Sequence, residues 1–256
     1  MRKSRAKSAN KEVFVEFIVA KGYAEMSRKA ADIIAQLVAS KPDCTLGLAT
    51  GSTPEGLYEC LVSDYNAGKI SFKDVSTYNL DEYRGLENDH PQSYHYFMEQ
   101  HLFNHVDIDL AATHVPDGSN PDATAACADY ESAIKACGGI DIQLLGLGHN
   151  GHIGFNEPAD CFARETNCVQ LTQSTIEANS RLFNSIDEVP TQAYTMGIGT
   201  IMRAAKVLLV ASGNGKAQIV KDAFFGPVTP QVPASILQFH PNVTVIVDEE
   251  AAALCQ

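Results

Sequence analysis

A chain of 256 residues is long enough to bury a substantial hydrophobic core within one large domain. Apolar residues make up 45% of the chain and charged residues 20%, which excludes an intrinsically disordered protein. The 19 Lys and Arg against 31 Asp and Glu give a net charge of −12, so we expect no nucleic-acid partner. A local group of donors can still bind a small anion.

We read the N-terminal region as a strand behind a tail and not as a secretory signal. No apolar run approaches the roughly 20 residues that span a bilayer, and the stretch 13–20 has Glu16 near its middle. We read residues 1–10 as a flexible basic tail. Seven scattered cysteines without a CxxC motif favour reduced thiols in a cytoplasmic protein. Without a repeat, linker or composition shift, we expect a single domain over 1–256.

Strand and helix patterns alternate along the chain. In chain order we expect a strand at 13–20, a helix at 23–38, a strand at 45–49, a helix from Pro54 to about Tyr65, a strand at 75–80, helices at 94–103 and 121–136, strands at 140–147, 194–196 and 207–211, a helix at 216–224 and a strand at 243–247. The alternation predicts an α/β fold with an open, mostly parallel sheet and helices on both faces. Ligands of such folds bind beyond the carboxyl ends of the strands.

The first polar strand end is a turn of small residues. Thr50, Gly51, Ser52 and Thr53 follow the strand at 45–49, and Pro54 opens the next helix. Hydroxyl groups and unpaired backbone N–H groups at a helix N-terminus suit an anion. No Gly-Lys-Ser/Thr follows, so the turn is not a Walker motif. A capped turn without a ligand is the alternative.

Two adjacent carboxylates follow the strand at 75–80. Asp81 and Glu82 are candidates for acid–base chemistry or metal binding, and a solvated loop is the alternative. Because successive side chains of an extended chain point in opposite directions, we expect only one of the two to face a given pocket.

A glycine-rich loop follows the strand at 140–147. Its G-x-G-x-x-G pattern at 146–151 would suggest a dinucleotide site, which requires a helix starting at those glycines. Gly154 and Pro158 interrupt such a helix. We therefore predict a loop that brings its backbone close to a ligand and presents His152 and Glu157, because imidazole exchanges protons near neutral pH.

Two cations are candidate phosphate ligands, and several histidines raise the question of a metal. Arg181 can form a phosphate fork, and Lys216 stands where another helix begins, although each alone is more often a surface charge. His101 and His105 have zinc-ligand spacing, but the Glu of the metalloprotease pattern is missing. A site formed by His149, His152 and Asp81 lacks a third nitrogen ligand, so we expect no required metal.

Taken together, these motifs resemble the glucosamine-6-phosphate deaminase family of the sugar-phosphate isomerase/lactonase superfamily. The resemblance extends from about residue 23 to 250, and the pairing of LDEY with GHIGFNEP is its most specific part. Its carriers are LATGSTPEGLY (48–58), STYNLDEYRGL (76–86), HPQSYHYFM (90–98), GLGHNGHIGFNEP (146–158), ANSR (178–181), TMGIGT (195–200) and SGNGKA (212–217).

The resemblance implies a Rossmann-like fold and an enzyme of amino-sugar catabolism. The reaction converts D-glucosamine 6-phosphate and water to D-fructose 6-phosphate and ammonia, by ring opening, a 1,2-proton shift and imine hydrolysis, without a cofactor. By the same resemblance, Asp81 moves the proton between C2 and C1, and His152 opens the ring with help from Glu157 and Asn150. The phosphate ligands would be Thr50, Gly51, Ser52, Thr53, Arg181 and Lys216.

The chain departs from some family members in two places. Some carry Asp at the position of Asn150, whose amide cannot exchange protons and can only orient His152. Larger hexameric members bind an N-acetylated sugar phosphate as activator through Ser, Arg and Lys. Here that stretch has Asp160, Cys161, Asn167 and Val169, and the long C-terminal extension is missing. We expect a monomer or small homo-oligomer without effector gating, whose partner is a small hexosamine phosphate.

Two other functions compete. A 6-phosphogluconolactonase would share the fold and the phosphate end, but we expect it to lack both Asp-Glu-Tyr and Asn-Glu-Pro. A sugar-phosphate-sensing regulator would need a DNA-reading module, for which there is no room ahead of Tyr23 and for which the charge is wrong.

Overall fold

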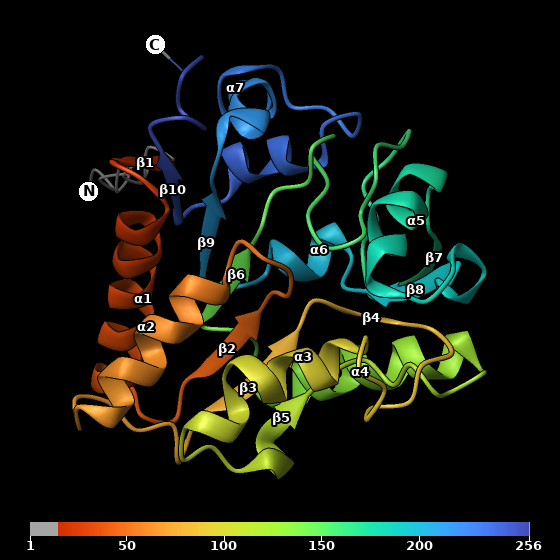
Figure 1. Cartoon of the computed structure of the whole chain (residues 1–256), viewed down its shortest axis with the longest axis horizontal. Coiled ribbons are helices and arrows are strands. Elements are labelled where there is room, and N and C mark those ends of the chain that lie inside the picture. The colour runs from red at the N-terminus through yellow and green to blue at the C-terminus, as the bar shows by residue number, and fades with distance from the viewer. Residues whose placement is uncertain (1–14, 256) are drawn as a thin grey trace, which may run out of the picture.

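The computed structural model describes residues 15–255, with the backbone alone at 174, 178 and 182. Seven strands form a parallel sheet in the order β1-β10-β9-β6-β2-β3-β5 (Figure 1). The strands of this sheet are β1 (Val15–Ala20), β2 (Thr45–Leu48), β3 (Ser76–Asn79), β5 (Thr113–His114), β6 (Ile142–Leu145), β9 (Lys206–Ala211) and β10 (Val243–Asp248).

A second, antiparallel sheet lies beside the first, at the end away from α1 (Figure 1). It has the order β4-β8-β7, with β4 at Asp81–Tyr83, β8 at Gln192–Thr195 and β7 at Asn167–Gln170. Leu80 joins the two sheets, because its N–H donates to the carbonyl of Leu48 at 3.0 Å and its carbonyl accepts from Met196 at 2.7 Å. The chain therefore passes directly from β3 into β4.

The helices lie on both faces of the large sheet. Phe17 of β1 packs edge-on against Phe224 of α7 (Ala217–Phe225), and on the same face Tyr78 donates a hydrogen bond to Ala133 of α4 (Ala123–Ala136). The opposite face is covered by α1 (Tyr23–Ser40) and its neighbour α2 (Glu55–Asn66). The remaining helices are α3 (Tyr94–His101), α5 (Gln173–Asn179), α6 (Ile198–Ile201) and the 3₁₀ turns η1 (Phe103–His105), η2 (Leu110–Ala112), η3 (Ser180–Leu182), η4 (Ile186–Glu188), η5 (Asn214–Lys216) and η6 (Pro233–Phe239).

The sequence patterns explain why these elements form. All six residues of β10 are buried, as expected for a central strand of a sheet covered on both faces. In α1, Ala30, Ile34 and Val38 recur every fourth residue and point into the core. Asp122 caps α4 by accepting hydrogen bonds from two backbone N–H groups of its first turn.

The predicted open, mostly parallel sheet with helices on both faces is confirmed, with local corrections. The predicted strand at 75–80 contains β3 (76–79) and Leu80, after which the chain enters β4 of the other sheet. The predicted strand at 194–196 overlaps the end of antiparallel β8 (192–195). The predicted helix at 216–224 begins one residue later, because the 3₁₀ turn η5 precedes it. Residues 13–14 and the predicted tail lie outside the described residues.

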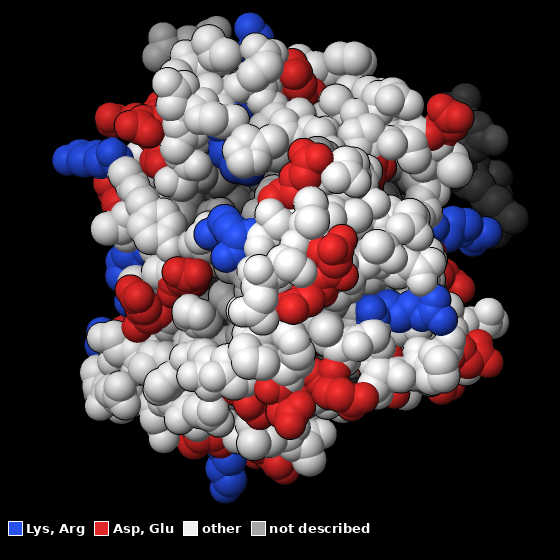
Figure 2. All heavy atoms as spheres, turned by 45° about the vertical axis from the view of Figure 1, so that its right-hand side comes forward, with Lys and Arg blue, Asp and Glu red and all other residues white. Residues whose placement is uncertain are grey.

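Within residues 15–255, the structure contains no helix that is both long and apolar enough to cross a membrane. Acidic side chains are spread over the face in Figure 2, where basic side chains stand singly and form no extended patch.

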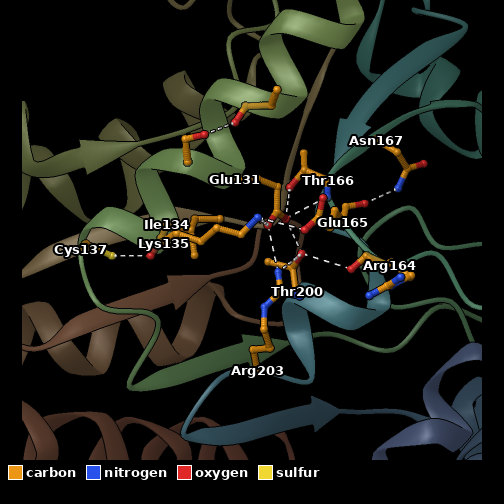
Figure 3. Close-up of polar contacts among 12 residues, drawn as sticks. Glu131, Ile134, Lys135, Cys137, Arg164, Glu165, Thr166, Asn167, Thr200 and Arg203 are labelled. Atoms are coloured by element: carbon orange, nitrogen blue, oxygen red, sulfur yellow. Dashed lines mark hydrogen bonds and ion pairs between the residues drawn. The ribbon is translucent and has the colours of Figure 1, made fainter.

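A buried carboxylate holds the small sheet against the large one. Glu131 of α4 is 3% exposed and accepts hydrogen bonds from the backbone N–H and hydroxyl of Thr166, both at 2.9 Å, and from the hydroxyl of Thr200 (Figure 3). Its other oxygen lies 2.9 Å from the guanidinium of Arg203. Glu131 thus connects α4, the segment before β7 and α6.

We expect Glu131→Ala to lower the free energy of unfolding by about 3 kcal/mol, because buried donors at Thr166 and Thr200 lose their acceptor. For a chain of this size, that loss corresponds to a fall in Tm of about 6–12 °C. Glu165→Ala is the control, since its ion pair with Lys135 is exposed and contributes under about 1 kcal/mol. Equal Tm values for the two variants would contradict the anchoring role.

Candidate active site

The candidate site lies where the order of the large sheet reverses. After β2 the chain continues to β3 on one side, whereas β6 lies on the other side of β2 and leads to β9. The loops that leave the carboxyl ends of β2 and β6 therefore diverge and leave a crevice between them. A cavity of about 240 Å³ fills this crevice, which suits a small metabolite. Its walls are Ala49, Thr50, Gly51, Ser52, Thr53, Leu80, Asp81, Tyr94, Gly146, Leu147, Gly148, His149, His152, Gly154, Phe155 and Lys216.

The turn at 50–53 forms one end of the cavity and is braced from outside. Tyr23 of α1 donates its hydroxyl to the carbonyl of Ser52 at 3.1 Å and accepts from the N–H of Gly56 at 2.8 Å. Gly51 has a φ of +99°, which other residues rarely adopt. Among the described residues, none accepts a hydrogen bond from the backbone N–H groups of 51–53. These groups, at the start of α2, can bind an anion in the cavity.

Asp81 lies at the junction of the two sheets, 7% exposed, and its carboxylate faces the cavity. No described residue donates a hydrogen bond to it. Gly154, with a φ of +57°, leaves space beside it, since a Cβ there would stand 3.4 Å from Asp81 Oδ2. Burial, and then the neighbouring Glu82, raise the pKa of Asp81 to about 8. Asp81 is thus a buried, unpartnered carboxylate that only a ligand in the cavity can reach.

Glu82 points the other way, which confirms the prediction that only one of the two carboxylates faces the pocket. Its carboxylate accepts hydrogen bonds from the N–H groups of Tyr94 and His95 at 3.0 Å and of Tyr83 at 2.7 Å. Burial raises the pKa of Glu82 to about 7, although these donors oppose the increase. Glu82 therefore fixes the start of α3 and with it the position of Tyr94.

Aromatic rings keep water from the buried side of Asp81. Tyr94 lies parallel to Phe155, with ring centroids 6.1 Å apart, and its centroid is 4.9 Å from that of Tyr83. Burial raises the pKa of Tyr94 well above its usual value, so its hydroxyl stays protonated. Sequence reasoning did not select Tyr94, although its place directly after the helix cap Ser93 could have indicated it.

His152 lies on the far side of the cavity, in the loop after β6. Its Nδ1 is 3.2 Å from Glu157 Oε1, and its ring lies against the backbone of Gly148, where a Cβ would come within 2.3 Å of the imidazole. Asn150 donates to the other carboxylate oxygen of Glu157, and Thr175 donates to Oε1 at 3.0 Å. Burial raises the pKa of Glu157, but these donors and His152 outweigh it and hold the pKa below its usual value. Sequence reasoning did not identify Thr175.

Lys216 lines the same cavity from the start of α7. Its ammonium donates to the carbonyl of Leu147 at 2.7 Å and lies 3.2 Å from Nδ1 of His149. Burial lowers the pKa of Lys216. The cavity therefore has a cation and the free amides of 51–53 among its walls, together with Asp81 and His152.

Arg181 is the predicted residue that lies elsewhere. It is exposed on η3 and lines a neighbouring cavity, which shares Gly51, Ser52 and Tyr94 with the first. The structure thus brings together Asp81, Asn150, His152, Glu157, Thr50, Gly51, Ser52, Thr53 and Lys216, and places Arg181 beyond the turn at 50–53.

The alternative chemistries find no support. No helix begins at the glycines of 146–151, so the dinucleotide motif lacks its structural context. Within residues 15–255, no three His, Cys, Asp or Glu side chains form a metal-binding group. His101 stacks on Phe97, and His105 contacts the carbonyl of Gln100.

Comparison with known proteins gives extensive matches. The model of the family described as glucosamine-6-phosphate isomerases/6-phosphogluconolactonase matches residues 20–246. The glucosamine-6-phosphate deaminase of Lachnoclostridium phytofermentans is 55% identical over 232 residues, covering 91% of this chain and 98% of that protein. That of Thermoanaerobacter pseudethanolicus is 50% identical over 240 residues, covering 94% and 95%.

Solved structures agree with these sequence matches. A structure described as a monomeric glucosamine-6-phosphate deaminase has a TM-score of 0.91 at 44% identity. The match covers 94% of this chain and 100% of that chain. A 6-phosphogluconolactonase from Trypanosoma cruzi has a TM-score of 0.76 at 21% identity, covering 94% and 97%. The second likeness shows the fold alone.

Proposed function

The chain belongs to the family of glucosamine-6-phosphate isomerases and 6-phosphogluconolactonases and deaminates glucosamine 6-phosphate as its named relatives do, and we propose that Asp81, His152 and the turn at 50–53 carry out this reaction. The products are D-fructose 6-phosphate and ammonia, and no cofactor takes part. The observation that carries the assignment of residues is the unpartnered, buried carboxylate of Asp81, which shares one cavity with His152, Lys216 and the free amides of 51–53.

Ring opening is the role that we propose for His152. The ring oxygen of the pyranose must gain a proton and the hydroxyl on C1 must lose one, and an imidazole can do both. Glu157 Oε1 lies 3.2 Å from Nδ1 and borders that side of the ring. Asn150 donates to Glu157, and its side-chain oxygen accepts from the backbone N–H of His152 at 3.2 Å. Its amide therefore orients the pair without exchanging a proton.

The 1,2-proton shift is the role that we propose for Asp81. One ionised carboxylate removes the proton from C2 of the open-chain sugar and returns it to C1. The amino-bearing C2 thereby becomes an imine, to which water adds, and ammonia leaves. A raised pKa makes Asp81 a stronger base than an exposed carboxylate.

The phosphate end supplies positioning as well as affinity. The turn at 50–53 and Lys216 would hold the phosphate, and the reacting carbons are then fixed relative to Asp81. Arg181 lines the neighbouring cavity, so its guanidinium would have to turn toward the shared wall at Gly51 and Ser52 to join them.

We expect Lys216→Ala to raise KM for glucosamine 6-phosphate by about 10- to 100-fold, the value of one charge-assisted hydrogen bond. Steady-state kinetics of ammonia release measure it, with the exposed Lys73→Ala as control. A KM equal to that of the parent would remove Lys216 from the phosphate site.

Ammonia release also tests the activity as a whole. The purified protein should release ammonia from glucosamine 6-phosphate and should not hydrolyse 6-phosphogluconolactone. The reverse outcome would assign the chain to the lactonase branch of the family.

We further propose that the enzyme is a monomer or small homo-oligomer without effector gating, as one structural relative is described as monomeric. The stretch that binds the activator in hexameric members has Asp160, Cys161, Asn167 and Val169 here, none of which is a cation. The seven cysteines are free, which supports a reducing, cytoplasmic setting.

We expect N-acetylglucosamine 6-phosphate to leave the substrate saturation curve hyperbolic and KM within about twofold of its value without the sugar, because none of those four side chains is a cation that could bind the phosphate. Initial rates over a range of substrate, with and without this sugar phosphate, measure it. A sigmoidal curve that the sugar phosphate converts to a hyperbola would contradict the proposal.

A further inference from the structure

His149 stands beside Lys216 on the wall of the cavity. The ammonium of Lys216 is 3.2 Å from His149 Nδ1 and 2.7 Å from the carbonyl oxygen of Leu147. Both acceptors belong to the loop after β6, whereas Lys216 comes from η5, after β9. Two of the three ammonium protons are thereby directed to the loop, and the third is available to a ligand.

The chemistry of the contact fixes the state of the histidine. An ammonium group only donates, so Nδ1 of His149 must accept and the ring must be neutral, with its proton on Nε2. The charged groups that face His149 are Lys216 and, further away, His152. The charge of Lys216, then burial, then His152, lower the pKa of His149, so the neutral form persists at physiological pH.

The backbone beside this contact leaves room for the imidazole ring of His149. Gly215 lies below the imidazole, where a Cβ would be 3.6 Å from Nε2. His149 itself makes no contact that the reaction steps above require.

We infer that His149 is a positioning residue for substrate phosphate, which holds the ammonium of Lys216 toward the end of the cavity formed by the turn at 50–53. The inference rests on the phosphate role proposed above for Lys216. A lysine side chain has many rotamers, and two acceptors from one loop restrict it before the substrate arrives. The free energy of phosphate binding then need not offset the entropy that is lost when the Lys216 side chain becomes ordered.

The test compares two substitutions that differ in one property. His149→Leu removes the acceptor, whereas His149→Asn places an amide oxygen near the position of Nδ1. Lys216→Ala shows the effect of losing the cation, and His105→Leu, at an exposed histidine outside the cavity, is the control. The measurements on each folded protein are kcat and KM for glucosamine 6-phosphate, and the Kd of inorganic phosphate by titration calorimetry.

We expect His149→Leu to raise KM and the Kd of phosphate by about 5- to 10-fold with kcat within about twofold of the parent, and His149→Asn to restore most of the affinity. Parent-like affinities for His149→Leu would overturn the inference, and so would equal impairment of the Leu and Asn variants. Phosphate binding is measured without turnover. A parent that binds phosphate but releases no ammonia would therefore refute the proposed function and leave the test of His149 intact.

Discussion

Asp81→Asn should abolish deamination while leaving the enzyme able to bind its phosphosugar. We expect kcat to fall by about 10³- to 10⁴-fold, because an amide cannot remove the proton from C2 and, among the described residues, Asp81 is the one carboxylate that lines the cavity. The Kd of fructose 6-phosphate should stay within about threefold, since the turn at 50–53 and Lys216 are unchanged. Ammonia release and calorimetric titration measure the two quantities.

The control for this variant is Asp129→Asn, at an exposed position of α4 outside the cavity. It should retain the parent's kcat and Kd. Turnover of Asp81→Asn at the parent's rate would refute the assignment of the base. Loss of phosphosugar binding together with turnover would instead show that Asp81 belongs to the binding determinants.

The raised pKa of Asp81 also predicts how the activity of the parent depends on pH. Burial and the neighbouring Glu82 raise this pKa to about 8, from an ordinary value of 3.8. The base must be ionised, so kcat/KM of the parent should rise with pH through the neutral range and level off above about pH 8. The acid limb of this kcat/KM profile therefore lies at a much higher pH than an exposed carboxylate would give.

The contribution of Asp81 to the stability of the folded protein should fall as the pH rises, whereas kcat/KM should increase. The folded state binds the Asp81 proton more tightly than the unfolded state, so the stability that the protonated group contributes is complete below about pH 4 and is lost as the pH rises through 8. Asp81→Asn should therefore melt at least about 2 °C above the parent at pH 8, and the difference should shrink at pH 5. A lower Tm for the variant at pH 8 would contradict burial of an ionised carboxylate.

His152→Gln should reduce kcat by about 10²- to 10⁴-fold, because the amide cannot carry a proton between the ring oxygen and the C1 hydroxyl. The sugar also opens spontaneously in water, so we expect residual turnover above that of Asp81→Asn. Initial rates of ammonia release measure the loss, with His105→Gln as the matched control. An unchanged kcat would exclude His152 from ring opening.

The main features of the fold could be predicted because they follow from local patterns. Buried apolar runs such as those of β9 and β10 identify central parallel strands, and the spacing of Ala30, Ile34 and Val38 identifies α1. The small antiparallel sheet could not be predicted. Its three strands have three or four residues each and come from distant parts of the chain, so long-range pairing at 81–83, 167–170 and 192–195 determines them.

The site was predictable where its residues follow strand ends. The carboxyl ends of β2 and β6 meet at one edge of the sheet, which brings the turn at 50–53 beside His152. Tyr94 and Thr175 were missed, and His149 was considered only as a metal ligand, because the role of each depends on a contact between elements that no local pattern reveals. Arg181 was a candidate because a guanidinium suits a phosphate and because of the resemblance, but no local pattern shows which cavity it lines, and the structure positions it in the adjoining one.

The most direct test of the account follows the hydrogen on C2. Glucosamine 6-phosphate that carries deuterium at C2 is converted in ordinary water, and the C1 hydrogens of the resulting fructose 6-phosphate are resolved by nuclear magnetic resonance. A single carboxylate at position 81 predicts that the hydrogen gained at C1 enters on one face only, with part of the deuterium carried over from C2, and that Asp81→Asn gives no such transfer. Entry on both faces of C1, or undiminished transfer in Asp81→Asn, would contradict it.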